Sequence, residues 1–176
     1  MKKNVRLLLA LVILLLCSAA SLYAKSLVVY YSLTGTTACL ASGIAKETDS
    51  DIFELKLINP YSTDGNKCSD ESKADKADNV QRQLKAVPDL SQYDTVFIGS
   101  PVWSNDIANP VETWLLQNQR FLSSKTVIPF CTYWSTGNKE VLSKIAQLST
   151  SKNIKEGISQ AHGQNADVKE WIKRIF

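Results

Sequence analysis

The chain has 176 residues, with 20 lysines and arginines against 17 aspartates and glutamates. The first 24 residues hold three of the basic residues and none of the acidic ones, so the remainder carries 17 of each sign. This length is that of one ordinary domain with a substantial core, and a neutral domain gives no electrostatic indication of nucleic-acid binding.

The first 24 residues have the layout of a signal peptide. Basic residues open the chain, an apolar run from Leu7 to Leu16 follows, and small residues lead up to Ala24. Ten apolar residues rise only about 15 Å as a helix against a hydrocarbon core of about 30 Å, so a membrane span is the weaker interpretation. We therefore predict cleavage before Lys25 and export of residues 25–176 to the periplasm or out of the cell.

Cys17 offers an alternative processing point, because it directly follows the apolar run as the cysteine of a lipoprotein does. Leu16 before it is bulkier than lipoprotein processing usually accepts. Attachment to a membrane through a lipid on Cys17 is therefore the less favoured expectation.

Three cysteines remain beyond the predicted signal peptide, Cys39, Cys68 and Cys131. Their spacing matches neither a zinc knuckle nor a C-x-x-C redox pair, and their odd number is not that of a disulfide framework. Cys39 and Cys131 lie in contexts typical of a core, where a cysteine usually serves as a small hydrophobic side chain. We expect no metal site.

Five segments of the exported part predict strands. The first, Ser26 to Tyr31, is apolar and does not alternate, as expected for a strand buried on both faces of a parallel sheet. Further strands are expected at 51–56, 95–98 and 125–130, and a weaker one at 154–159.

Helices are expected between and after these strands. Thr36 or Thr37 is positioned to cap the first helix. A polar loop, Ser62 to Asp78, is expected to lead into a helix at 77–85. Asn109 and Pro110 predict a cap and a first-turn proline for the next helix, and the last two helices are expected at 139–148 and 168–176.

This alternation predicts an α/β fold, a doubly wound parallel sheet with right-handed crossovers and helices on both faces. In such sheets a ligand binds beyond the carboxyl ends of the strands, where the strand order reverses. The loops after the first, third and fourth strands are therefore the candidate site.

The loop after the first strand, Ser32 to Thr37, reads Ser-Leu-Thr-Gly-Thr-Thr and leads directly into a helix. Backbone N–H groups and the positive end of a helix bind a phosphate without a lysine, and hydroxyls add hydrogen bonds. A capped helix after a polar turn is the alternative interpretation. The loop lacks the lysine of a P-loop and the G-x-G-x-x-G of dinucleotide-binding proteins. The acidic cluster of a receiver domain is also missing, since the strand ends in Tyr30 and Tyr31.

Three segments together carry a resemblance to a known family. Ser32 to Thr37 fits the pattern S/T-x-T-G-x-T, Gly99 to Trp103 fits G-x-P-x-W, and Phe130 to Thr132 reads F-C-T. In these segments the chain resembles the flavodoxin family, and its short members above all, over essentially all of residues 25–176. The resemblance implies a three-layer sandwich with a five-stranded parallel sheet of order 2-1-3-4-5, and flavin mononucleotide (FMN) as the cofactor.

The FMN contacts that the resemblance implies come from all three loops. The first loop is expected to bind the phosphate, and Trp103 of the second is expected to stack on the isoalloxazine ring. The expected cofactor contacts are Ser32, Thr34, Gly35, Thr36, Thr37, Pro101, Val102, Trp103, Ser104, Asn105, Asp106, Thr132, Tyr133, Trp134 and Gly137.

The second and third loops depart from the family's pattern. Tyr133 and Trp134 occupy positions where small residues are common, so they either cover the second face of the flavin or close the site. The glycine often found after the tryptophan is missing, which leaves open how Ser104 and Asn105 tune the flavin's potential. Asp106 either holds the ring edge or caps the next turn.

Three functions follow as alternatives. The chain is an electron carrier acting outside the cytoplasm with a redox partner protein or a small-molecule acceptor, an FMN-dependent reductase that passes hydride from NAD(P)H to a quinone-type acceptor, or a binding module without cofactor. FMN chemistry requires no catalytic acid or base from the protein. His162, the only histidine, lies in a polar turn and is expected to be a solvated surface residue.

Overall fold

The computed structural model describes residues 25–176, and the predicted signal peptide with Cys17 lies outside the described residues. The strands are β1 (Ser26–Tyr30), β2 (Asp51–Glu54), β3 (Thr95–Trp103), β4 (Asp106–Ile107), β5 (Thr126–Tyr133), β6 (Asn153–Ile154) and β7 (Ile158–Ala161). The helices are α2 (Thr36–Thr48), α3 (Gly65–Ala77), α4 (Asn109–Leu122), α5 (Asn138–Ser149) and α6 (Val168–Ile175).

The sheet has the order β2-β1-β3-β5-β6, with parallel pairing along this path. β7 pairs with the carboxyl half of β5, and the two-residue β4 pairs antiparallel with β3. β6 and β7 together occupy the fifth position, so the predicted doubly wound α/β fold and its order 2-1-3-4-5 are confirmed.

The fifth strand position is divided because β5 carries a proline there. Pro129 lacks the N–H that a sheet ladder needs, and pairing skips from Val127–Ile154 to Phe130–Ile158. Gly157 passes close to this point, where an added Cβ would lie 2.5 Å from the Pro129 carbonyl oxygen. The predicted strand at 154–159 is therefore two short ones.

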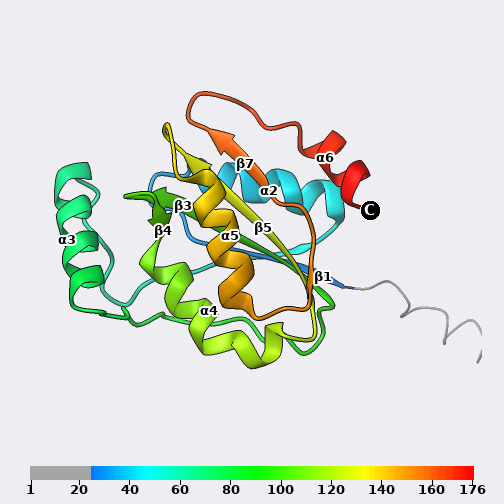
Figure 1. Cartoon of the computed structure of the whole chain (residues 1–176), viewed down its shortest axis with the longest axis horizontal. Coiled ribbons are helices and arrows are strands. Elements are labelled where there is room, and N and C mark those ends of the chain that lie inside the picture. The colour runs from blue at the N-terminus through cyan, green and yellow to red at the C-terminus, as the bar shows by residue number, and fades with distance from the viewer. Residues whose placement is uncertain (1–24) are drawn as a thin grey trace, which may run out of the picture.

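The helices cover both faces of the sheet (Figure 1). α4 and α5 lie over one face, and α2 and α6 lie over the other. Alternate residues of β1 face the two layers, since Leu27 and Val29 pack with α4 and α5 while Val28 and Tyr30 pack with α2 and α6. α3 stands to one side, near the end of β3.

The segment between β2 and β3 differs from the prediction. The expected loop contains α3, which Asp64 caps by accepting a hydrogen bond from the Lys67 N–H. The helix expected at 77–85 does not form, because this stretch pairs with the chain after β2. The Ile58 N–H donates to Gln83, and the Lys85 N–H donates to Lys56.

Local predictions at two helix starts were wrong. Gly35, with φ of 90°, is the N-cap residue of α2, and neither threonine caps it. Asn109 is the first residue of α4 and not its cap; its side chain donates to the Val80 carbonyl and accepts from the Arg82 N–H. Pro110 does lie in the first turn of α4, as predicted. Cys39 was expected in the core but is exposed.

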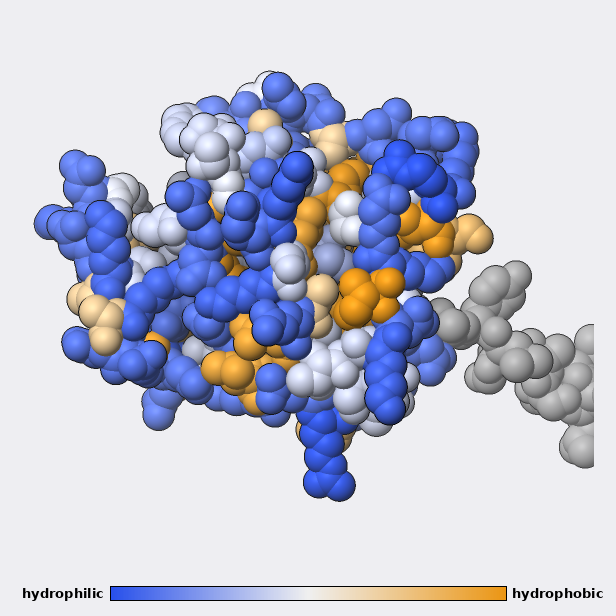
Figure 2. All heavy atoms as spheres, in the orientation of Figure 1, coloured by the Kyte–Doolittle hydropathy of each residue, from blue (hydrophilic) through white to orange (hydrophobic). Residues whose placement is uncertain are grey.

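The face of the molecule drawn in Figure 2 is largely hydrophilic. Figure 2 shows, in the orientation of Figure 1, hydrophobic side chains in small separate groups among hydrophilic ones. Among residues 25–176, no helix is long and apolar enough to cross a membrane. The most exposed of the large hydrophobic side chains in this part is Trp134, at 71%.

Candidate functional site

A cavity of about 660 Å³ lies at the carboxyl ends of the strands. Its volume is within the range of about 300–1,000 Å³ that is usual for ligand and cofactor pockets. All three predicted loops contribute to it, and the start of α3 and the turn after β7 complete it. The lining residues are Leu33, Thr34, Thr36, Thr37, Gly65, Pro101, Val102, Trp103, Thr132, Tyr133, Trp134 and His162.

The amino end of α2 forms the polar wall of this cavity. The helix has 13 residues, no side chain caps it, and its first turn has no acidic residue. Thr34 and Thr36 bring their hydroxyl oxygens within 3.4 Å of each other, while the Gly35 N–H donates to Ser32 Oγ. The wall therefore combines uncapped N–H groups with hydroxyls, which suits an anion.

A buried hydrogen bond fixes this wall to the sheet. The hydroxyl oxygens of Thr37 and Thr132 lie 2.7 Å apart, and both residues are buried. Since Thr37 lies in the first turn of α2 and Thr132 lies near the end of β5, the bond holds two of the three predicted loops in register.

Two tryptophans form the aromatic part of the cavity. Trp103 lies between Tyr31 and Tyr61, with ring centroids 5.6 and 5.0 Å away and ring planes nearly perpendicular. β3 extends to Trp103, so this indole projects from a strand end and not from the polar loop that was expected. Burial raises the pKa of the neighbouring Tyr31 to about 12, and this phenol stays neutral.

Trp134 is far more exposed, and His162 is its neighbour. The two ring centroids are 3.5 Å apart. His162 is exposed as predicted, but it lines the cavity, which sequence reasoning missed. The backbone N–H of His162 donates to the Tyr133 carbonyl and so continues the pairing of β5 with β7. Only knowledge of that pairing would have placed the histidine here.

α3 adds a wall that the sequence did not predict. An adjoining cavity of about 400 Å³ shares Trp103 and Trp134 with the first and is closed by Cys68, Ser69 and Ser72. Burial raises the pKa of the Cys68 thiol, with a smaller contribution from a nearby glutamate. The thiol is therefore a neutral part of this wall.

The turn between β3 and β4 lies at the rim. Ser104 and Asn105 both have positive φ, 52° and 60°. Thr136 Oγ1 donates to Asn105 Oδ1 over 2.8 Å, and a Cβ at Gly137 would lie 2.8 Å from Asn105 Cα. Ser104 lines the second cavity and Asn105 a smaller one of about 260 Å³.

Six expected contacts do not line the main cavity: Ser32, Gly35, Ser104, Asn105, Asp106 and Gly137. Ser32 and Gly35 are joined by a hydrogen bond within the first loop, and Gly137 lies against Asn105 of the rim turn. Asp106 accepts a hydrogen bond from the N–H of Ile107 and forms ion pairs with Lys76 and Lys144. It lines a separate cavity of about 240 Å³.

The described residues contain no group of three or more histidine, cysteine, aspartate or glutamate side chains that could hold a metal ion. The site is thus a doubly wound α/β sheet edge with a neutral anion-binding helix start and aromatic walls. This combination defines a class of proteins that bind a planar, phosphate-bearing cofactor.

Comparison with known proteins identifies the family. The family model described as flavodoxin matches residues 25–175, and the chain belongs to the flavodoxin family. A search of the curated proteins gave no match.

Solved structures agree with this assignment. A protein of Bacteroides eggerthii DSM 20697 is 26% identical with a TM-score of 0.74, over 86% of this chain and 98% of the other. One of Bacteroides uniformis ATCC 8492 is 29% identical with a TM-score of 0.70, over 85% and 98%. A flavoprotein of Lactobacillus acidophilus NCFM, solved in complex with FMN, is 27% identical with a TM-score of 0.68, over 86% and 98%.

Proposed function

We propose that this protein binds FMN in the main cavity and transfers electrons outside the cytoplasm, to a redox partner protein or a small-molecule acceptor. The observation that carries the proposal is the convergence of uncapped N–H groups, threonine hydroxyls and two indoles on one cavity of about 660 Å³. The relative in complex with FMN supports the choice of cofactor.

The residues present suit the two ends of FMN. Thr34 and Thr36, with the N–H groups of the first turn of α2, would hold the phosphate. Trp103 and Trp134 would face the isoalloxazine ring, since both line the cavity and aromatic faces suit a flat ring. FMN supplies the redox chemistry when bound, and the protein's part is to bind and orient it and to set its electrostatic surroundings.

The exposure of Trp134 argues against the alternative in which the protein is a binding module that holds no cofactor. This indole stands at the rim, 71% exposed, and leaves a cavity of about 660 Å³ beside it. A side chain that closed the site would instead be buried within it. We therefore favour the interpretation in which Trp134 covers the flavin.

The lining chemistry favours a carrier over an NAD(P)H-dependent reductase. None of the residues that line the three cavities at this edge is lysine or arginine. NAD(P)H carries a pyrophosphate, and binding it beside FMN would add at least two negative charges to an edge without a basic side chain.

Titration with FMN tests the proposal on the protein recovered after expression of the full chain. We expect tight binding with strong quenching of flavin fluorescence. Thr34→Val with Thr36→Val should weaken FMN binding about tenfold or more, since each hydrogen bond to a charged group contributes about 1.5–3 kcal/mol. Riboflavin, which lacks the phosphate, should bind both proteins alike. A folded protein without affinity for FMN would refute the proposal.

Two further variants assign the stacking residue. Trp103→Ala should bind FMN while retaining much of its fluorescence, and Trp134→Ala reports whether the second indole also quenches. Phe121→Ala is the matched control, because this aromatic residue is 58% exposed and lines none of these cavities. Unchanged quenching in Trp103→Ala would show that Trp103 does not stack on the ring.

A further inference from the structure

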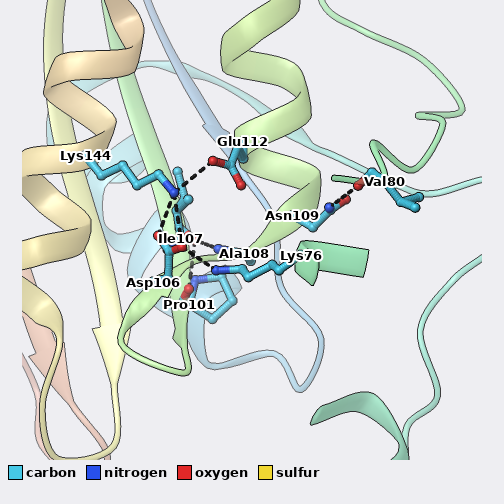
Figure 3. A network of polar contacts seen from close by, with 10 residues as sticks. Lys76, Val80, Pro101, Asp106, Ile107, Ala108, Asn109, Glu112 and Lys144 are labelled. Carbon is cyan, nitrogen blue, oxygen red and sulfur yellow. Dashed lines mark hydrogen bonds and ion pairs between the residues drawn. The ribbon is translucent and has the colours of Figure 1, made fainter. Parts of the chain in front are cut away.

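A compact network of four charged side chains lies beside the rim of the site (Figure 3). Asp106 forms ion pairs with Lys76 at 2.6 Å and with Lys144 at 2.9 Å, and Lys144 also pairs with Glu112 at 2.8 Å. The two ammonium groups and two carboxylates balance in charge. All four side chains are partly buried, with exposed fractions between 22% and 31%.

At Asp106 and Lys144, the ion pairs shift the pKa more strongly than burial does. Burial alone would raise the pKa of Asp106, but hydrogen bonds from Lys76 and Lys144 outweigh it and the pKa is lowered. Burial likewise would lower the pKa of Lys144, whereas hydrogen bonds to Glu112 and Asp106 raise it. Asp106 and Lys144 therefore keep their charges at neutral pH.

The network reaches the walls of the site through the backbone. Asp106 pairs with Trp103 across the β3–β4 turn, so the charge lies one strand away from an indole of the cavity. Lys76 lies on α3, whose opposite end contributes Gly65 and Cys68 to the cavities. Lys144 lies on α5, and Figure 3 shows both lysines pointing at Asp106 from different elements.

We propose that Asp106, Lys76 and Lys144 are positioning residues that hold the rim turn and, by balancing one another's charge, keep any one of these charges from shifting the reduction potential of the bound flavin. This inference rests on the proposed function. An electron added at the site brings negative charge, and partly buried charges nearby act on it with little screening. A balanced network contributes little net potential, but the loss of one member leaves a unit charge of known sign.

The test measures the midpoint potential of bound FMN in single-charge variants, by equilibration with a reference dye. Asp106→Asn leaves net positive charge and should raise the potential, while Lys76→Met and Lys144→Met should lower it. The ratio of the Kd values for oxidised and reduced FMN should change by about two- to tenfold in opposite directions. The double variant Asp106→Asn with Lys144→Met should return toward the wild-type value.

Matched controls lie at the other end of the sheet. Lys25→Met and Asp51→Asn remove the partners of an ion pair at the amino ends of β1 and β2, at 3.0 Å, and should leave the potential unchanged. Shifts of one common sign, or none, in the network variants would overturn the inference. Failure of the wild-type protein to bind FMN would instead refute the proposed function, and so the two failures are distinguishable.

Discussion

At the scale of single residues, the rim turn carries side chains in a backbone conformation that favours glycine. Two-residue hairpin turns with positive φ at both central positions prefer Asn and Gly, and here they are Ser104 and Asn105. The side chain of Ser104 forms none of the hydrogen bonds found among the described residues that would offset this strain. The missing glycine noted in the sequence is thus at the first of the two strained positions.

We predict that Ser104→Gly raises the free energy of unfolding by about 0.5–1 kcal/mol, because relief of the left-handed strain exceeds the added entropy of the unfolded chain. Urea denaturation measures the change. Ser69→Gly is the control, since Ser69 lies inside α3 and glycine there should destabilise by about 0.5–1 kcal/mol. Equal losses in the two variants would contradict the strain argument.

Sequence reasoning at this scale identified nine of the twelve residues that line the main cavity, but not what the charged side chains contact. The hydroxyls of the first loop were predicted from the order of the elements, and the two tryptophans from the resemblance of their loops to those of the flavodoxin family. Asp106 was placed in the right turn, yet its partners Lys76 and Lys144 are 30 and 38 residues away in sequence. Such pairs depend on how α3 and α5 pack, and no local pattern encodes them.

At the scale of elements, the ring of Phe130 on β5 lies directly against Gly99 of the neighbouring β3. A Cβ at this position would lie 2.1 Å from Cζ of Phe130 on the neighbouring strand. We predict that Gly99→Ala lowers the free energy of unfolding by about 3 kcal/mol, at the upper end of overpacking costs. Phe130→Leu should relieve the clash, so the double variant should lose less than the sum of the single losses, as a denaturation cycle would show.

The hydrogen bond between Thr37 and Thr132 joins α2 to β5. Either Thr→Val change leaves the other buried hydroxyl without its partner, and we predict a loss of about 1–3 kcal/mol for each. The double variant should lose clearly less than the sum, because two methyl groups then meet with no unpaired hydroxyl. Additive losses would show that the hydrogen bond does not couple the two elements.

The elements with apolar patterns were predicted well, and α3 was not. The buried strands and α6 follow from their apolar residues, whereas α3 has almost no apolar face. It is held instead by its Asp64 cap and by ion pairs of Asp75 and Lys76 with residues outside the helix. A helix stabilised in this way resembles a polar loop in sequence, and the prediction there failed for that reason.

At the scale of the whole molecule, the alternation of strands and helices was enough to predict at which edge of the sheet the candidate site lies. A parallel sheet brings the carboxyl ends of its strands to one edge, and the order reverses between β1 and β3. The hydroxyl loop after β1 and the tryptophan at the end of β3 therefore had to meet. The contribution of α3 to the second cavity could not be predicted, since it depends on a helix that stands apart from both layers.

The fold also bears on where the chain would be cut. The Lys25 carbonyl accepts hydrogen bonds from the N–H groups of Asp94 and Thr95, at 2.9 and 3.4 Å. Cleavage before Lys25 leaves these contacts intact, so the exported protein would keep the whole sheet. A chain that begins at Leu27 loses this acceptor, and we expect its Tm to be lower than that of residues 25–176.

We predict that the full chain, expressed in a bacterium that exports proteins, yields a periplasmic or secreted product that begins at Lys25. Intact-mass measurement identifies the cut, and cell fractionation identifies the compartment. Cys17→Ser should change neither, because Cys17 lies in the segment that is removed. A product whose mass shows a lipid on Cys17, and whose membrane association that variant abolishes, would establish the lipoprotein alternative. In that case the lipid would hold the chain at a membrane on the side where β1 begins. The cavity proposed for FMN lies at the opposite edge of the sheet, at the carboxyl ends of the strands, and would therefore face away from the membrane.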